Sequence, residues 1–323
     1  MRAALRDRFG APEDVVEVRE VDKPVPEDDE VLVRVRAASI NIADWYAVVG
    51  RPLIGRISVG VRRPKTIELG IDYAGTVEAV GKNVTDFQPG DDVFGGRNGA
   101  LAEYVRAKAD RGIVLKPTTI SFEEAATVPV AGLTALQGLR DRGELHAGQN
   151  VLVNGASGGV GTFAVQVGKA LGAAVTAVCS TANVEPARSM GADDVVDYTK
   201  DDFTRSDNRY DLMLDVAGSR SWSECRRVLK PEATVVLVGG PRNRILGPIG
   251  HVVALRLGGV FSRRKVTFFI AKINKPDLEV LRGMLEAGQV KPAIDRTYEL
   301  SDVAEAFRYI GEGHARGKIV ITV

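Results

Sequence analysis

A glycine-rich stretch that follows an apolar run is the strongest chemical signal in the chain. The run Val151–Val153 leads into a turn in which Ala156, Gly158 and Gly161 have the spacing of a dinucleotide-binding fingerprint. Residues 162–171 then show the apolar spacing of a helix. Small residues let the backbone approach a pyrophosphate, and a helix N-terminus offers that group partial positive charge. The stretch therefore predicts a dinucleotide site.

Further apolar segments alternate with helical patterns after this turn, which predicts a doubly wound parallel sheet. These segments are Val175–Val178, Asp194–Val196, Leu212–Leu214, Thr234–Val238 and Val266–Ile270. Ligands bind such sheets at the carboxyl ends of the strands. The candidate cofactor-binding residues at those ends are Ala156, Ser157, Gly158, Gly159, Val160, Gly161, Ser180, Thr181, Tyr198, Gly239 and Gly240.

The second strand of this sheet is followed by residues 179–183, Cys-Ser-Thr-Ala-Asn, which contain no acid. An acidic residue at this place would bind the ribose hydroxyls of NAD. Its absence leaves nothing to repel a 2′-phosphate, so the sequence favours NADP(H). Thr181 or Asn183 also suits the cap of the next helix. Arg188 either reaches the phosphate or is a solvated helix residue.

The chain before residue 120 has a different texture, with short alternating strands separated by glycine and proline. We predict strands at 31–36, 74–80, 92–94 and 100–105, which form an antiparallel, barrel-like β domain. A capping box, Ser121 to Glu124, starts a helix. Strand signals return after Lys291. The predicted domains are therefore 1–120 with 291–323, and 121–290.

Length and composition limit the class of protein. A chain of 323 residues suggests two domains. A net charge of +1 lacks the basic surplus of a nucleic-acid binder, so we expect no nucleic-acid partner. Two cysteines form no disulfide framework, and the N-terminus has no apolar signal segment. We therefore expect a cytoplasmic protein.

Several longer motifs are distributed along the chain, at residues 39–46, 69–77, 90–94, 125–134, 154–161, 191–198 and 313–318. Together they resemble the medium-chain dehydrogenase/reductase superfamily, in its zinc-independent quinone oxidoreductase and enone reductase branch. The resemblance covers essentially the whole chain. It implies an α/β protein with a GroES-like, β-barrel-type catalytic domain, a Rossmann domain and a cleft between them, and we expect a homodimer.

The resemblance implies that Asn41, Asp44 and Tyr46 lie beside the nicotinamide and the substrate. A tyrosine hydroxyl stays protonated at neutral pH, so Tyr46 is able to donate to a substrate oxygen. Asn41 holds either the nicotinamide amide or that oxygen. The alternative is local: Asn41 caps a short helix, Asp44 is its third residue and Tyr46 serves packing.

Three further residues receive roles from the resemblance alone. Thr134 contacts the nicotinamide, Tyr198 lies near the adenosine ribose and its phosphate, and Lys318 reaches the cofactor from the last strand. Each has a structural alternative, as a helix threonine, a half-buried tyrosine and a solvated lysine. Many relatives carry Arg or Lys where this chain has Ala182, which removes one cationic contact to a 2′-phosphate.

A zinc site is not expected from the residues present. Zinc relatives carry Gly-His-Glu where this chain has Gly70-Ile71-Asp72. Catalytic zinc needs about three ligands and a structural site often takes four cysteines. The chain has three scattered histidines and two cysteines. We therefore expect activity without a metal.

These features predict an NADPH-dependent oxidoreductase that transfers hydride to a quinone or an α,β-unsaturated carbonyl. A nucleotide-binding interaction or structural protein with little turnover, as in crystallin-like relatives, is one alternative. A zinc-free alcohol dehydrogenase is another. The segment 242–275, basic and apolar, is expected to cover the cleft or a subunit interface. Contact with an anionic membrane surface is the less favoured interpretation.

Overall fold

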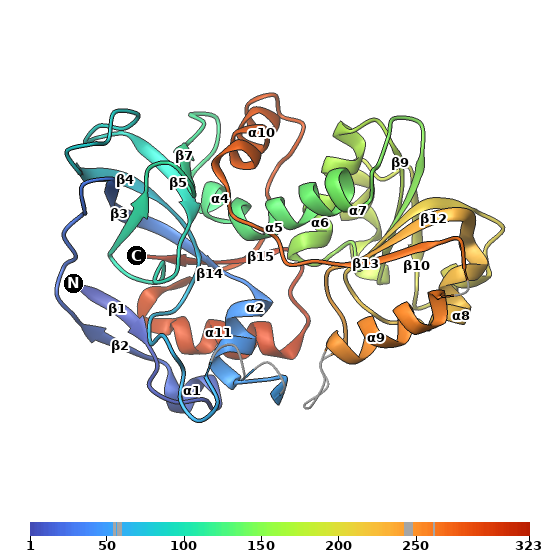
Figure 1. Cartoon of the computed structure of the whole chain (residues 1–323), viewed down its shortest axis with the longest axis horizontal. Coiled ribbons are helices and arrows are strands. Elements are labelled where there is room, and N and C mark those ends of the chain that lie inside the picture. Colours follow the sequence, from blue (N-terminus) through green and yellow to red (C-terminus); the bar gives the residue numbers. More distant parts are fainter. Residues whose placement is uncertain (54–55, 57–59, 242–247, 261) are drawn as a thin grey trace. The chain divides into compact units, whose positions relative to one another are not determined.

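The computed structural model describes residues 1–53, 56, 60–241, 248–260 and 262–323 (Figure 1). The chain divides into two compact units. Unit 1 comprises Met1–Leu133, Lys272–Gly288 and Pro292–Val323, and unit 2 comprises Thr134–Ala271 and Gln289–Lys291. The domain boundaries near residues 120 and 291 remain predictions.

Unit 1 is built on a mostly antiparallel sheet with the strand order β14-β15-β3-β4-β5-β7, and β6 also pairs with β3. Strands β1 and β2 form a separate antiparallel pair. Among the described strands of unit 1, β14 and β15 are the one parallel pair. The strands are β1 Arg2–Leu5, β2 Glu17–Glu20, β3 Glu30–Ile40, β4 Asp72–Val80, β5 Asp92–Gly96, β6 Tyr104–Lys108, β7 Ile113–Leu115, β14 Ile294–Glu299 and β15 Lys318–Thr322.

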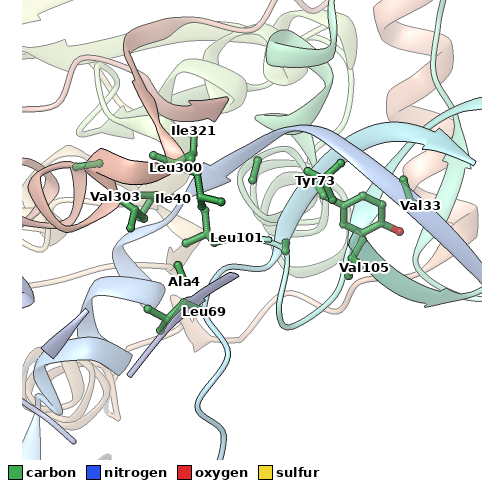
Figure 2. Packing of buried hydrophobic residues seen from close by; sticks show 14 of the residues in the cluster. Ala4, Val33, Ile40, Leu69, Tyr73, Leu101, Val105, Leu300, Val303 and Ile321 are labelled. Carbon is green, nitrogen blue, oxygen red and sulfur yellow. The ribbon is translucent and has the colours of Figure 1, made fainter. Parts of the chain in front are cut away.

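The core of unit 1 forms where the apolar faces of these strands meet the helices. Figure 2 shows Ile40, Ile321 and Leu300 close together, with Tyr73 further along the sheet. Alternation of apolar and polar residues along β3 is what turns one face of that strand to the core. The helices are α1 Pro12–Val15, α2 Ile42–Val49, α4 Phe122–Ala126, α10 Lys275–Glu286 and α11 Val303–Glu312, and α5 Val128–Leu136 crosses the unit boundary.

Unit 2 is a six-stranded, fully parallel sheet with the order β10-β9-β8-β11-β12-β13. This order confirms the predicted doubly wound fold. Successive strands are added outward from β8 to β10 on one side, and then from β11 to β13 on the other side of β8. Figure 1 shows α6 and α7 on one side of the sheet and α8 and α9 on the other. The elements are β8 Asn150–Asn154, α6 Gly159–Ala170, β9 Ala174–Cys179, α7 Val184–Ser189, β10 Asp194–Asp197, β11 Tyr210–Asp215, α8 Trp222–Cys225, β12 Leu229–Leu237, α9 Pro248–Gly259 and β13 Lys265–Phe268.

One predicted strand of unit 1 is misplaced. The sequence predicts a strand at 100–105, whereas β6 begins at Tyr104. Ala100 and Leu101 are fully buried although they precede the strand. The Leu101 N–H donates to Leu69 O at 3.0 Å, and Leu101 O accepts the Ala4 N–H at 2.8 Å. Their apolar character therefore reflects burial of a loop in the core.

The helices are short. The longest α-helices of the described residues, α6, α9 and α10, each have 12 residues. Within the described ranges, no helix combines the length and the apolar character needed to cross a bilayer.

Candidate functional site

Strand register in unit 1 brings three polar residues from distant parts of the sequence to one place. In the antiparallel pair β15–β3, Ile319 lies opposite Ile40. In the pair β3–β4, Ser39 lies opposite Asp72. Lys318, which starts β15, and Asn41, which follows β3, therefore meet Asp72 at the start of β4.

Asp72 is the centre of this polar cluster. Its Oδ2 accepts hydrogen bonds from Ser39 Oγ at 3.0 Å and from Asn41 Nδ2 at 2.9 Å. Lys318 Nζ lies 3.1 Å from the same oxygen and 2.5 Å from Asn41 Oδ1. Asp72 Oδ1 accepts the Val130 N–H, in the first turn of α5, at 3.0 Å. Both carboxylate oxygens are thus occupied by protein donors.

Burial makes this cluster rigid. Asp72 is fully buried, and the side chain of Lys318 is 3% exposed. A buried charge is tolerated when it is paired and hydrogen-bonded. The ammonium of Lys318 and the carboxylate of Asp72 form an ion pair. Asp72 accepts the Asn41 Nδ2 and Lys318 donates to the Asn41 Oδ1, so both ends of the Asn41 amide are fixed. The side chain of Asn41 is therefore held in one orientation, with no freedom to flip.

Asp44 joins the cluster through the start of helix α2. Its Oδ2 accepts the Asn41 backbone N–H at 2.8 Å. Asp44 thus has the capping role of the local alternative, whereas the side chain of Asn41 is used by Asp72 and Lys318. The pKa of the Asp44 carboxyl is raised to about 7, mainly by burial and in smaller part by the Asp72 charge, while the Asn41 N–H and Lys318 oppose the shift.

A pH dependence of stability follows from Asp44. Its pKa is about 7 in the fold, against about 4 in an unfolded chain. Between these values the folded state holds a proton that the unfolded chain has released, so stability falls as pH rises. Relative to Asp44→Asn, the wild-type free energy of unfolding should fall by on the order of 2–3 kcal/mol between pH 5 and 8. Urea denaturation of both proteins measures this, and parallel pH curves would contradict it.

Tyr46 lies on the same helix as Asp44 and is half-buried. Its ring meets the Trp45 ring edge-on, with centroids 5.3 Å apart. This contact fits the packing alternative and leaves the donor role a prediction. Thr134 is half-buried on helix α5.

The glycine turn of unit 2 has the geometry that the sequence predicts. Gly155 takes a left-handed φ of 91°, and Gly158 is the N-cap of α6. A Cβ on Gly161 would lie 2.1 Å from Gly155 O, so only glycine lets the helix pack this close to the turn. A Cβ on Gly158 would have no atom nearer than 3.7 Å. Ser157 and Gly158 are partly exposed, as are Gly159 and Val160, so this turn is open at the helix N-terminus.

A second buried polar network joins the carboxyl ends of the central strands. Asp215, which ends β11, accepts hydrogen bonds from Asn154 Nδ2 at 2.7 Å and from the Gly218 N–H at 2.8 Å. His251 Nε2 of α9 lies 3.1 Å from its other oxygen. The sequence does not predict this network, because its members come from three separate elements. The network holds together the carboxyl ends of β8 and β11, next to the glycine turn.

The predicted glycine pair after β12 lies at the same edge. A Cβ on Gly239 would lie 2.1 Å from Val216 O. A Cβ on Gly218 would lie 2.4 Å from Gly240 Cα. The backbones therefore approach each other closely here, which explains the small residues without reference to a ligand.

The end of β9 differs from the sequence interpretation in one respect. Residues 179–183 hold no acid, but Asp197 of β10 accepts the Thr181 hydroxyl at 2.5 Å. This hydrogen bond is the main cause that lowers the Asp197 pKa to about 2, so the group is a carboxylate at neutral pH. The prediction that no carboxylate lies at this strand end was wrong. Asp197 is close to Thr181 in space but not in sequence.

The remaining residues at this end have mixed surroundings. Ser180 Oγ accepts the Asn183 side chain at 2.9 Å. Tyr198 is 54% exposed, which leaves its ring accessible to a ligand. Arg188 pairs with Glu185 at 2.8 Å, as a solvated helix arginine does. Lys200 lies 3.4 Å from Asp197 and partly balances its charge.

A metal site needs several ligands close together. The part of the chain that the structure describes contains no cluster of three or more His, Cys, Asp or Glu side chains that could hold a metal ion. Both cysteines, Cys179 and Cys225, are buried free thiols. Burial raises their pKa values, to about 11 and about 12 respectively.

Two family models match the chain. Residues 27–118 match the alcohol dehydrogenase GroES-like domain, and residues 190–321 match a model described as zinc-binding dehydrogenase. The GroES-like match covers the β strands of unit 1 from Glu30 to Leu115.

Relatives of known name cover nearly the whole chain. Mouse mitochondrial NAD(P)H oxidoreductase RTN4IP1 is 34% identical, over 91% of this chain and 82% of its own length. Trans-enoyl reductase pgmF of Aspergillus terreus is 35% identical, over 91% of this chain and 86% of its own. The solved quinone oxidoreductase of Coxiella burnetii has a TM-score of 0.86 and 28% identity, over 100% of this chain and 99% of that one. The chain belongs to the medium-chain dehydrogenase/reductase superfamily.

Proposed function

We propose that the protein is an oxidoreductase that passes hydride from a nicotinamide dinucleotide to a quinone or an α,β-unsaturated carbonyl. The observation that carries this proposal is the open glycine turn at the carboxyl edge of a doubly wound sheet. The buried cluster of Asn41, Asp72 and Lys318 supports it, since a rigid polar cluster suits a reaction site. Similarity to NAD(P)H, quinone and trans-enoyl reductases supports the acceptor class.

The residues of unit 2 fit a dinucleotide. Gly161 packs α6 against the turn, and a Cβ on Gly158 would point into open space. Backbone N–H groups at a helix N-terminus bind phosphates well. We assign residues 156–161 to the pyrophosphate, Ser180, Thr181 and Tyr198 to the adenosine ribose, and Gly239 and Gly240 to the remaining dinucleotide.

Residues of unit 1, together with Thr134 of unit 2, are assigned to the reacting groups. When bound, the reduced nicotinamide supplies the hydride. Negative charge develops on the acceptor oxygen during reduction, so a hydrogen-bond donor placed there lowers the barrier. We assign that donor to Tyr46 and the orientation of the nicotinamide to Asn41, with Thr134 and Lys318 in support. Asp44, with its pKa of about 7, holds a proton that the product requires.

Tyr46→Phe tests the proposed function and the donor role together. Oxidation of NADPH and NADH is followed with a range of quinones, alkenals and enones, before and after dialysis against a chelator. Loss of the hydroxyl should lower kcat/KM by roughly 100-fold and leave nucleotide binding intact. If the ring only packs, turnover stays unchanged. Wild-type protein that binds the nucleotide but reduces no acceptor would favour the non-enzymatic alternative.

We further propose that this activity is independent of zinc. Both oxygens of Asp72 are engaged by protein donors, and the Lys318 ammonium lies 3.1 Å from one of them. A cation bound there would face that positive charge. Loss of activity on chelation, with about one zinc per chain by elemental analysis, would overturn the proposal.

We propose NADPH as the preferred cofactor. Residues 179–183 contribute no acid, and Lys200 offers a positive charge beside Asp197. The Asp197 carboxylate opposes a 2′-phosphate, so the expected preference over NADH is modest.

Ala182→Arg should raise NADPH affinity by roughly 10-fold and change NADH affinity by less than about twofold, because a guanidinium recognises a phosphate. Titration of both nucleotides by fluorescence measures the two affinities. Arg188→Gln is the matched control: Arg188 already pairs with Glu185, so its loss should leave both affinities unchanged. Equal gains for NADPH and NADH would place the phosphate elsewhere.

A further inference from the structure

Helix α9 of unit 2 exposes an apolar stripe. Ile249, Val253 and Leu257 are 38%, 49% and 67% exposed, and Val260, directly after the helix, is 64% exposed. Their spacing of four, four and three residues puts them on one face, because an α-helix turns about 100° per residue. A different face of the helix, with Val252 and Leu255, is buried in the core of unit 2. The solvent-facing side of α9 is therefore apolar where a surface helix is ordinarily polar.

The surroundings of this stripe are positively charged. From Ala233 to Pro276 the sequence contains no Asp or Glu. Exposed arginines are Arg256 on α9 and Arg263 beyond its end. Two more, Arg226 and Arg227, follow helix α8, which packs against α9. Residues 242–247 and 261 of this segment lie outside the described residues.

Glu224 of α8 is the acid nearest in sequence to Arg226 and Arg227. It accepts hydrogen bonds from the Ser221 backbone N–H and hydroxyl at 2.8 and 2.6 Å, and its charge also interacts with Arg227. Glu224 therefore offsets part of the charge beside α8, whereas residues 233–276 add no acid to balance Arg256 and Arg263. The α9 surface, meaning the apolar stripe with Arg226, Arg227, Arg256 and Arg263, combines exposed aliphatic side chains with an excess of positive charge.

We propose that the α9 surface docks on an anionic lipid surface. Aliphatic side chains enter the boundary between headgroups and acyl chains, and arginines attract anionic headgroups. A second copy of the chain is a poorer occupant. In a two-fold symmetric contact the α9 surface would pack against the same surface of the other subunit, so two positively charged surfaces would meet. The sequence alone favoured coverage by the cleft or a subunit interface; the exposure and the charge of α9 favour the lipid.

Docking would also give the site access to acceptors dissolved in a membrane. This consequence rests on the proposed function, because it concerns the quinones and enones that the reductase takes. The docking itself does not, since it is a binding property of the full chain.

Vesicle co-sedimentation of the purified full-length protein tests the proposal. Vesicles of phosphatidylcholine alone are compared with vesicles that contain roughly 30 mol % phosphatidylserine, and we expect about tenfold stronger partition onto the latter. Val253→Gln with Leu257→Gln should reduce that partition about tenfold, and Arg256→Gln with Arg263→Gln should remove its dependence on phosphatidylserine. Val280→Gln is the matched control, a 41% exposed valine on helix α10.

Thermal unfolding and nucleotide titration of each variant show that it is folded, independently of turnover. Equal partition onto both vesicle types, or an equal loss with Val280→Gln, would overturn the proposal. Sedimentation velocity gives the remaining outcome. The double variant Val253→Gln with Leu257→Gln could convert a dimer to a monomer while the wild type does not bind vesicles. The occupant of the stripe would then be a second copy of the chain, and the lipid proposal would fail.

Discussion

Asp72→Ala is expected to be the most destabilising single change in unit 1. It removes the acceptor of four donors: Ser39, Asn41, Lys318 and the Val130 N–H. It also leaves the Lys318 ammonium buried without its counterion. Removal of one partner of a buried ion pair costs about 3–5 kcal/mol. The free energy of unfolding, measured by urea denaturation, should fall by that amount.

Two controls separate the buried pair from a generic loss of charge. Asp86→Ala removes the partner of Lys275 at 2.7 Å in an exposed pair and should cost less than about 1 kcal/mol. Asp72→Ala combined with Lys318→Met should recover part of the lost stability, because no uncompensated charge remains. A single Asp72→Ala variant as stable as Asp86→Ala would show that the cluster is not structural.

The activity of the same variants bears on the proposed site. Without Asp72, the amide of Asn41 loses the partner of its Nδ2 and is held only through its contact with Lys318. If Asn41 orients the nicotinamide, kcat should fall more than nucleotide affinity in variants that remain folded, because misplacement of reacting groups by about 1 Å costs roughly 100-fold in rate. A drop confined to nucleotide affinity would place Asn41 on the binding side alone.

Local sequence patterns were sufficient for the architecture of unit 2. Each of its strands contains a short apolar stretch, and the turn after Val153 needs small residues for reasons that act within a few positions. The capping box at Ser121 and Glu124 was predicted for the same reason and is present. Patterns of this kind depend on the pleat, the helix period and the turn geometry, which the local sequence determines.

The partners of the candidate site could not be predicted in this way. Asp72 and Lys318 are 246 positions apart, and only the register of β15, β3 and β4 brings them together. Asp197 was overlooked beside Thr181 because Thr181 follows β9 whereas Asp197 ends the neighbouring strand β10, 16 positions away. Buried polar groups choose partners in space, so their identity follows from tertiary structure rather than from spacing along the chain.

Gly161→Ala should abolish nucleotide binding by disrupting the turn itself. The added Cβ would lie 2.1 Å from Gly155 O and 2.7 Å from the backbone of Ala156, and backbone atoms cannot give way as a flexible side chain can. We expect a loss of stability of about 1–3 kcal/mol. Because the turn must shift to accommodate the methyl group, nucleotide affinity should fall by roughly 100-fold or more. Thermal unfolding and fluorescence titration measure the two effects.

Gly158→Ala distinguishes a glycine that the fold requires from one that a ligand requires. Its Cβ would meet nothing nearer than 3.7 Å, and its φ of −80° suits any residue, so stability should change by less than about 0.5 kcal/mol. Nucleotide affinity should nevertheless fall by roughly 10-fold, since a methyl group there would obstruct a phosphate at the helix N-terminus. Gly283→Ala on α10, with open space around it, controls for the exchange itself. If Gly158→Ala binds the nucleotide as tightly as the wild type does, the phosphates do not approach this turn, and the dinucleotide assignment of residues 156–161 fails even though the fold is intact.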